Sequence, residues 1–347
     1  MKKFSVPIAI IVSLVFLGAA PKAFADGFYE GKTIRFIVGY APGGGYDTYT
    51  RLTARHINKY IPGNPTTVVD NMEGAGSLLA ANYLYSKAEP DGLTVGNWNS
   101  GMITQQALGQ KGVRFDGRKF GWIGAPTVGW PVCAVMAFTG LKTWDNIVNS
   151  GKELKFGSTG PGATTDDLPK LMNMLVGTKL KVIPGYKGTS HIRAAMQRRE
   201  IDGACWTWDS MRVTGRSMLD ATGDDKLIPF IIYGKTGDPE VKELPQFNEV
   251  VKGKENVAAF KAWANPYAFQ RPLMLPPKTP KDRLQILRQA FKATLEDSEF
   301  FAEAKKAKLH IQYVSGEEIE KYVDEILAIP PATKETLAFL VKKAKKK

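Results

Sequence analysis

The sequence predicts an α/β fold of two similar lobes, each a mainly parallel sheet flanked by helices. Short apolar, β-branched runs alternate with helical patterns over residues 33–100, which is the βαβ arrangement of a parallel sheet. A strand, a glycine-rich loop and a helix open this region at residues 33–60, and the same order returns from Leu154. Removing the first 25 of the 347 residues leaves 322, which is enough for two domains with sizeable cores.

The first 25 residues have the pattern of a secretory signal. Lys2 and Lys3 precede an apolar stretch at residues 4–20, and Ala23-Phe24-Ala25 is an A-x-A cleavage site. We expect export, cleavage after Ala25 and a mature chain that begins at Asp26. A retained N-terminal anchor is the alternative, but the apolar stretch is short for a membrane span and a cleavage site follows it.

The chain is strongly basic, with 47 lysines and arginines against 34 acidic residues and a formal net charge of +13. Such an excess suits nucleic acid, an anionic membrane surface or acidic small molecules. Much of it lies in lysine runs at residues 305–308 and 342–347, which are typical of solvated helix faces or tails. Arginines do not interleave with aromatic residues as in a single-strand binding groove, so we expect no nucleic-acid partner.

Cysteines and histidines give no sign of a metal site. Cys133 and Cys205 stand in apolar runs, which favours two buried free thiols over one disulfide, the alternative in an oxidising compartment. The three histidines have none of the short ligand spacings of a structural zinc site. We therefore expect neither a metal nor a cofactor.

The opening unit has the clearest local chemistry. The run Ile34–Val38 suits a buried strand, Gly43-Gly44-Gly45 follows it, and Asp47 stands at the predicted N-cap of a helix that ends by Pro62-Gly63. Glycines let a ligand approach the backbone, and the free N–H groups and dipole of a helix start favour an anion. As a cap alone, Asp47 needs no ligand contact.

The rest of the first lobe follows with short links. A second glycine turn at residues 71–76 leads into a helix, and a later strand ends at Asn97-Trp98, on the edge where parallel sheets hold their ligand crevice. We place the crossing to the second lobe at Pro126–Pro131. The predicted strands cover residues 66–70, 93–96, 120–125 and 132–138, and the helix covers residues 77–87.

The second lobe repeats the opening unit. The loop Thr159–Thr165 follows a strand and leads into a helix whose predicted cap is Asp166 or Asp167. Trp206 fits core packing, whereas Trp98 and Trp208 are candidates for the wall of a cleft. The predicted strands cover residues 154–158, 181–184 and 203–208, and a further helix covers residues 190–199.

The closing segment is mostly helical and connects the lobes again. Leu273–Leu275 predicts a strand that returns to the first lobe, residues 281–295 predict a helix, and Ser315–Glu318 is a capping box before another helix. The predicted domains are 26–128 for the first lobe, 129–247 for the second, and 248–347 for the crossover strand and C-terminal helices, part of which returns to the first lobe.

The usual catalytic motifs do not occur in this sequence. The three glycines with Asp70 imitate a dinucleotide loop, but their spacing is not G-x-G-x-x-G, and there is neither a P-loop nor a nucleophile elbow. An enzyme remains an alternative only through groups that folding would bring together, such as Asp47, Asp209 and Tyr186.

Several short motifs occur in a fixed order. They are Pro42-Gly43-Gly44 with Asp47, Asn71 with Gly74-Ala75-Gly76, Pro90-Asp91-Gly92, Gly157-Ser158 with Gly160 and Gly162, Tyr186-Lys187-Gly188, Asp202, and Pro276-Pro277 with Thr279-Pro280. In this combination the chain resembles the periplasmic substrate-binding proteins of tripartite tricarboxylate transporters, the Bug or TctC family. The resemblance spans nearly the whole mature chain.

The resemblance implies a two-lobed, periplasmic-binding-protein-like clamp (a Venus flytrap) that works in the periplasm as a monomer and without catalysis. It would close on a small organic carboxylate (di-, tri- or aromatic) and deliver it to the large and small membrane subunits of the transporter. A binding protein for another transporter or a sensor is the first alternative, and a periplasmic enzyme acting on a small anion is the second.

The resemblance and the strand ends together give the expected ligand-binding residues. Gly185-Tyr186 replaces the usual proline-tyrosine order of the family, and Thr164-Thr165-Asp166 stands where serine and histidine are frequent. The expected residues are Ala41, Pro42, Gly43, Gly44, Gly45, Asp47, Asn97, Trp98, Ser158, Thr159, Gly160, Gly162, Thr164, Thr165, Tyr186 and Trp208.

Overall fold

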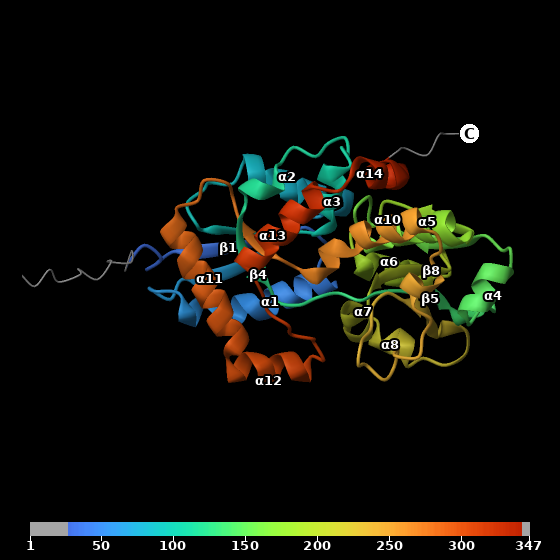
Figure 1. Cartoon of the computed structure of the whole chain (residues 1–347). Helices are drawn as coiled ribbons and strands as arrows, with labels where there is room; N and C mark the ends of the chain where they lie inside the picture. Colours follow the sequence, from blue (N-terminus) through green and yellow to red (C-terminus); the bar gives the residue numbers. More distant parts are fainter. Residues whose placement is uncertain (1–26, 342–347) are drawn as a thin grey trace, which may run out of the picture.

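A computed structural model describes residues 27–341. The predicted signal peptide and its cleavage site lie outside these residues. Two sheets, each flanked by helices, form two lobes that lie side by side (Figure 1). The predicted α/β class is confirmed, and the strand pairing makes both sheets mixed rather than mainly parallel. Within residues 27–341, no helix is both long enough and apolar enough to span a membrane.

The first sheet has the strand order β11-β4-β10-β3-β1-β2. β1 pairs in parallel with β2 and β3, whereas β10 and β11 come from the C-terminal third and pair antiparallel. The strands are β1 (Thr33–Val38), β2 (Thr66–Asn71), β3 (Thr94–Asn97), β4 (Gly121–Ala125), β10 (Leu273–Leu275) and β11 (Val314–Ser315). The helices of this lobe are α1 (Gly45–Ile57), α2 (Leu78–Ser86), α3 (Gly101–Ala107), α11 (Lys281–Glu296), α12 (Ser298–Lys306) and α13 (Gly316–Leu327).

The second sheet has the order β7-β6-β8-β5-β9. β6 pairs in parallel with β7 and β8, and β5 pairs antiparallel with β8 and β9. Its strands are β5 (Pro131–Met136), β6 (Leu154–Gly157), β7 (Leu180–Ile183), β8 (Gly203–Thr207) and β9 (Leu227–Ile232). Its helices are α4 (Trp144–Asn149), α5 (Thr164–Val176), α6 (Thr189–Gln197), α7 (Trp208–Thr214), α8 (Arg216–Leu219), α9 (Phe247–Val250) and α10 (Lys254–Ala264).

The C-terminal segment joins both lobes. The predicted strand at Leu273–Leu275 forms as β10 and lies between β3 and β4, so the chain returns to the first sheet after building the second. The last helix, α14 (Pro331–Leu337), lies beside α10 of the second lobe (Figure 1), where Leu337 enters the same core as Phe260. The exact lobe boundaries remain a prediction.

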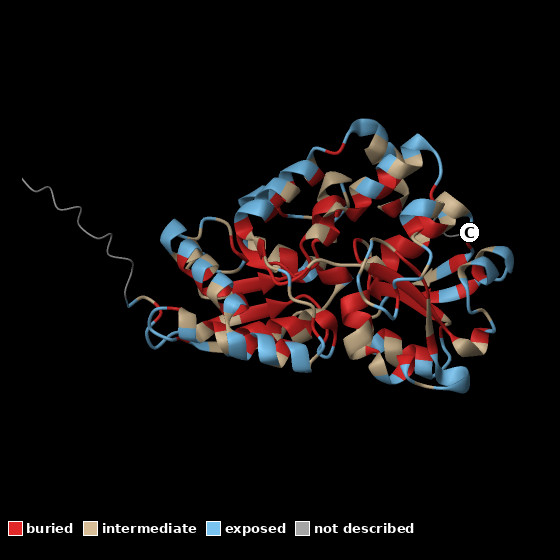
Figure 2. Cartoon of the chain, turned by 60° about the horizontal axis from the view of Figure 1, so that its bottom comes forward, coloured by how far each residue is buried: buried red, intermediate tan, exposed pale blue. Residues whose placement is uncertain are grey.

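Hydrophobic side chains fill both faces of each sheet, and the buried residues therefore concentrate in and around the two sheets (Figure 2). In the first lobe, Phe36 packs with α1 and α11, and Trp122 packs with α2, α3 and α13. In the second lobe, Phe156 packs with α5 and α10, and Trp206 packs with α6 and α7.

Two predicted helix caps are wrong and one is right. α1 begins at Gly45 with Gly44 as its N-cap, so Asp47 is the third helical residue. α5 has Ala163 as its N-cap, so neither Asp166 nor Asp167 caps it. Acidic residues are favourable at every position in the first turn of a helix. An aspartate in the sequence therefore did not show which of these positions it would occupy. The capping box of α13 forms as predicted, with the Ser315 hydroxyl accepting the N–H of Glu318 at 3.2 Å.

The prediction of two free thiols is wrong, because Cys133 and Cys205 form a disulfide. The antiparallel pairing of β5 with β8 places the two residues directly opposite each other, with their Cα atoms 4.0 Å apart. Their apolar neighbours in the sequence indicated burial correctly, but gave no information on this register.

Replacing both cysteines by alanine is expected to lower the free energy of unfolding by about 2–4 kcal/mol, because the bridge restricts the unfolded chain over a long loop. Urea unfolding of the oxidised wild type and the C133A/C205A variant measures the difference. Dithiothreitol should destabilise the wild type and leave the variant unchanged. Equal stabilities in oxidising buffer would contradict this expectation.

Candidate functional site

A cavity lies between the two lobes, where the loop before α1 faces the loop before α5. Its volume is about 50 Å³, counted as the space that the centre of a water molecule can reach. The wall has hydroxyl, amide, aromatic and small residues, and one charged residue, Arg271. The wall residues are Tyr40, Gly44, Gly45, Tyr46, Asn99, Thr159, Ala163, Thr164, Thr165, Thr189, Trp206, Thr207, Ser210, Gln270 and Arg271.

The first loop presents its backbone to the cavity because it has no side chains there. Gly44 has an extended conformation (φ −95°, ψ 172°) that any residue can adopt, so its role is to leave space. A Cβ atom on Gly45 would lie 2.5 Å from the Ser210 hydroxyl and 2.9 Å from Arg271 Nη2. Only glycine therefore fits at position 45 when the lobes are in contact.

Asp47 holds the first loop from behind. Its carboxylate accepts hydrogen bonds from the Gly43 N–H at 3.0 Å, from Arg51 Nε at 2.9 Å and from Asn71 Nδ2 at 3.0 Å. Burial opposes ionisation, but these hydrogen bonds outweigh it and lower the pKa of Asp47 below its usual value. Asp47 is thus a charged, paired support of the loop and lies outside the wall.

The second loop contributes hydroxyl groups. The Thr159 and Thr165 hydroxyls lie 3.0 Å apart, and the Thr165 hydroxyl also accepts the N–H of Thr159 at 3.1 Å. Ser158 lies behind them, where its hydroxyl donates to Asp166 at 2.7 Å and accepts the N–H of Gly160 at 3.0 Å. Ser158 therefore shapes the loop, and the threonines form the wall.

Three helices begin at the cavity without a side-chain cap. Their N-caps are Gly44 for α1, Ala163 for α5 and Gly188 for α6, and none of these residues has a side-chain oxygen. The first N–H groups of a helix have no acceptor within it, and the helix dipole makes this end partially positive. Since first-turn residues of all three helices line the cavity, the arrangement suits an anionic oxygen.

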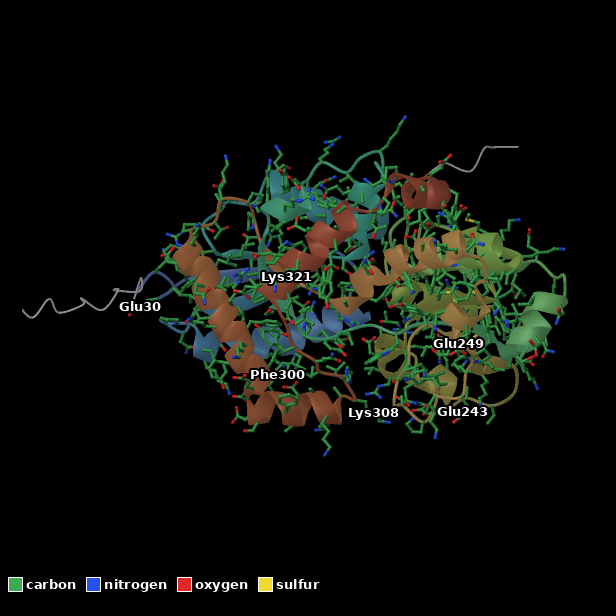
Figure 3. The ribbon with its side chains drawn as sticks, in the orientation of Figure 1. Glu30, Glu243, Glu249, Phe300, Lys308 and Lys321 are labelled. Atoms are coloured by element: carbon green, nitrogen blue, oxygen red, sulfur yellow. A yellow bond between two sulfur atoms is a disulfide. The ribbon has the colours of Figure 1, made fainter. Side chains whose placement is uncertain are left out.

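The lobes are closed over this cavity. The Gly76 N–H donates to the Thr159 carbonyl at 3.0 Å, which joins the second glycine turn of one lobe to the loop of the other. On the surface, the Lys308 carbonyl just after α12 accepts two hydrogen bonds from Arg212, at 2.7 and 3.1 Å; Figure 3 shows Lys308 beside the second lobe. Further contacts between the lobes join Asn99 to Gly162, Ala41 to Lys187, and Ser190 to Pro42.

Arg271, the charged residue of the wall, was not predicted from the sequence. Its side chain is 2% exposed, and its Nη2 lies 2.5 Å from Oδ2 of Asp209 in α7 of the second lobe. Its guanidinium lies over the Tyr49 ring, 4.3 Å from the ring centre. Its backbone φ of +58° is rare outside glycine. Among residues 27–341, Nε and Nη1 of Arg271 have no hydrogen-bond acceptor.

Asp167 is a buried carboxyl group behind the second loop. It accepts the Gly162 N–H at 3.0 Å and lies 3.3 Å from Gln105 Nε2 and 3.4 Å from Trp263 Nε1. Burial, together with the neighbouring Asp166 carboxylate, raises the pKa of Asp167 to about 7.

Within the described part of the chain, one group of residues has the composition of a metal site. Atoms of His56, Asp297 and Glu299 lie within 4.8 Å of one another. The Lys59 ammonium already contacts this group, at 2.6 Å from Asp297 and 2.8 Å from Glu299. We therefore assign no metal to it, and it lies between α1 and α12, outside the cavity wall.

The predicted site residues fall into three groups. Gly44, Gly45, Thr159, Thr164 and Thr165 line the cavity. A second group supports the wall: Ala41, Pro42, Gly43, Asp47, Asn97, Ser158, Gly160 and Gly162 bind the loops, the other lobe or, for Asn97, the Arg271 carbonyl. A third group lies away from the wall: Trp98 packs in the core of the first lobe, Tyr186 packs on the second lobe, and the Trp208 indole N–H donates to Asp238.

Of the fifteen wall residues, only the five of the first group were predicted as ligand-binding residues. Trp206, expected to be a core residue, packs in the second core and also reaches the wall. Thr189 had a signal, since it follows Gly188 at a helix start. For Arg271 the only signal was its place just before the crossover strand.

Comparisons with known proteins agree on one group. A family model described as "Tripartite tricarboxylate transporter family receptor" matches residues 51–330. A UPF0065 protein of Agrobacterium vitis is 28% identical over 285 residues, which cover 79% of this chain and 75% of that protein. A UPF0065 protein of Cupriavidus necator is 24% identical over 334 residues, covering 92% and 91%.

Solved structures share the two-lobed fold at low sequence identity. The periplasmic binding protein BugD superposes with a TM-score of 0.70 at 19% identity, over 90% of this chain and 98% of that one. MatC from Rhodopseudomonas palustris, with bound malate, has a TM-score of 0.68 at 20% identity over 90% and 99%. Another R. palustris protein, with adipate, has a TM-score of 0.69 at 17% identity over 89% and 97%.

The stability that Asp167 contributes relative to asparagine is expected to fall as the pH rises from about 4 to about 7. The unfolded chain releases this proton near its ordinary pKa of 3.8, whereas the folded protein keeps it until about 7. In this window the unfolded state binds fewer protons, so deprotonation favours unfolding, with a slope of up to about 1.4 kcal/mol per pH unit.

Urea unfolding of the wild type and of Asp167→Asn across this pH range measures the effect. The difference between their free energies of unfolding should change steadily in favour of the variant. A difference that is independent of pH would contradict the assignment of a raised pKa.

Proposed function

Since this chain belongs to the tripartite tricarboxylate transporter receptor family, we propose that it captures a small organic carboxylate between its lobes for such a transporter. The observation that carries the proposal is the closed cavity onto which three uncapped helix starts converge. These helix starts supply N–H donors and partial positive charge to an anion without any competing side-chain cap. Two neighbours with the same fold, one with bound malate and one with adipate, support a carboxylate as the ligand.

Ligand capture would be coupled to closure. A ligand that contacts both loops gains interactions in the closed state that the open state lacks, and it therefore shifts the population toward closure. The loops before α1 and α5 come from different lobes, so both lobes would contact the ligand. The family and the fold are those of solute-binding proteins, and we propose that this protein acts without catalysis.

We also propose that the mature protein is a periplasmic monomer that begins at Asp26 and delivers its ligand to one large and one small membrane subunit. The signal pattern at residues 1–25 supports the location, and the family supports the partners.

A screen of carboxylates is expected to find ligands that raise the melting temperature. A ligand at 100 times its Kd stabilises the folded state by about 2.7 kcal/mol. The panel should contain di- and tricarboxylates, hydroxy acids, aromatic acids and amino acids, and calorimetry should follow for each hit. If no carboxylate in the panel stabilises the protein, the proposed function is wrong.

Gly44→Val tests the loop itself and is expected to weaken binding of any hit at least 10-fold. The backbone conformation of Gly44 accepts valine, but a Cβ there lies 3.1 Å from the Thr189 hydroxyl of the other lobe, so a branched side chain obstructs closure. Gly237→Val is the matched control, because a Cβ at Gly237 meets no atom within 4 Å. Unchanged affinity of Gly44→Val would rule out the backbone cradle.

Exported protein is expected to have lost its first 25 residues. N-terminal sequencing of the protein from a periplasmic extract should read Asp-Gly-Phe-Tyr, the residues that follow Ala25. A chain that still begins at Met1 would instead support the retained anchor.

A further inference from the structure

The charges around the cavity are almost completely paired. Arg271, the charged residue of the wall, is neutralised by Asp209 at 2.5 Å, and both side chains are at most 2% exposed. Asp209 belongs to the second lobe and Arg271 precedes a strand of the first, so this pair forms across the closed cleft. The wall therefore has a cation but no net charge.

The charged residues behind the two loops are paired in the same way. Asp47 binds Arg51 behind the first loop, and Asp166 binds Lys170 behind the second. Between the lobes, Glu73 binds Lys187 at 3.0 Å. Asp167 has its carboxylate oxygens near three N–H donors, and its raised pKa leaves it only partly ionised at neutral pH.

Arg193 is the exception. It lies in α6, and its guanidinium donates to the Gly43 carbonyl at 3.1 Å and to the Thr214 hydroxyl at 2.9 Å, which are both neutral groups. Among residues 27–341, no carboxylate forms an ion pair with Arg193. Burial alone shifts the pKa of Arg193, and it lowers that pKa. It contacts the first loop directly and lies outside the wall, so within the described residues a cation without a carboxylate partner lies next to this loop.

One unpaired cation and three helix starts can compensate one carboxylate. A second carboxylate on the ligand would lose its hydration in a small closed cavity, where Asp209 already neutralises Arg271. An uncompensated buried charge is costly in free energy. By contrast, Nε and Nη1 of Arg271 still lack acceptors. They could donate to a neutral oxygen, such as an amide or hydroxyl, at the other end of the ligand.

We propose that the site selects a small carboxylate with one net negative charge and a neutral hydrogen-bond acceptor at its other end, and that the Arg271–Asp209 pair enforces this choice. The proposal rests on the proposed function and deepens it by naming the ligand class. Arg271 supplies donors without surplus charge, because Asp209 cancels that charge whenever the lobes close.

The test compares dicarboxylates with their monoamides, which match them in size and shape but have one charge fewer. Succinate and succinamate, malate and its monoamide, and adipate and adipamate are titrated into the mature wild-type protein by calorimetry near pH 7.5. We expect at least one monoamide to bind 10-fold or more tightly than its dicarboxylate.

Asp209→Asn tests the role of the ion pair. It leaves the Arg271 charge uncompensated, so the ratio of dicarboxylate to monoamide affinity should rise at least 10-fold. In the double variant Arg271→Met/Asp209→Asn the wall is neutral again, and the preference for the monoamide should return, with weaker binding of both. Asp238→Asn is the matched control, because it frees Arg212 outside the wall and should leave the preference unchanged.

The possible outcomes distinguish a failure of charge selection from a failure of the proposed function. A wild type that binds the dicarboxylates as tightly as the monoamides, or more tightly, overturns charge selection but keeps the carboxylate receptor. No binding in either series also overturns it, and the wider carboxylate screen then decides the fate of the proposed function. An Asp209→Asn variant that folds, as judged by circular dichroism, yet keeps the wild-type ratio shows that Asp209 does not set the selection.

Discussion

The site depends on three helix starts whose N-cap residues offer no side-chain acceptor to the first backbone N–H groups. Glycine or alanine stands at the N-caps of α1, α5 and α6, where serine, threonine or aspartate would otherwise satisfy one of these donors. Unsatisfied buried donors cost free energy, so the closed cavity favours a guest that can accept hydrogen bonds. The acidic residues of α1 and α5 lie within the first turn instead, where they support the loops without occupying the cavity.

Closure brings charge as well as backbone together. The Arg271–Asp209 pair is almost fully buried and joins the lobes, so its two halves meet only when the cleft closes. A buried ion pair gains little net stability, because desolvation of both ions offsets their attraction, and its effect is chiefly on geometry and charge balance. The ion pair therefore makes the closed state specific without stabilising it strongly.

Local sequence patterns predicted the strands and helices that flank the two loops, because apolar periodicity and glycine turns depend only on a few neighbouring residues. Leu273–Leu275 forms the predicted crossover strand, and the capping box at Ser315 forms as expected. The incorrect predictions concern residue types, here aspartate and tryptophan, that fit more than one position of an element. Asp47 was predicted at the N-cap but is the third residue of its helix, and Trp98, at the end of its strand, packs in the core of the first lobe rather than in the cavity wall.

The sequence by itself determined the α/β class, the two glycine loops and five of the six wall residues that those loops contribute, because each depends on neighbours along the chain. The tertiary structure alone decided which distant residues meet. Cys133 bonds to Cys205 through the register of β5 and β8, and Arg271 meets Asp209 through the approach of two lobes. The periodicity of an element shows which of its faces is buried, but the partner on the other side depends on strand order and lobe packing.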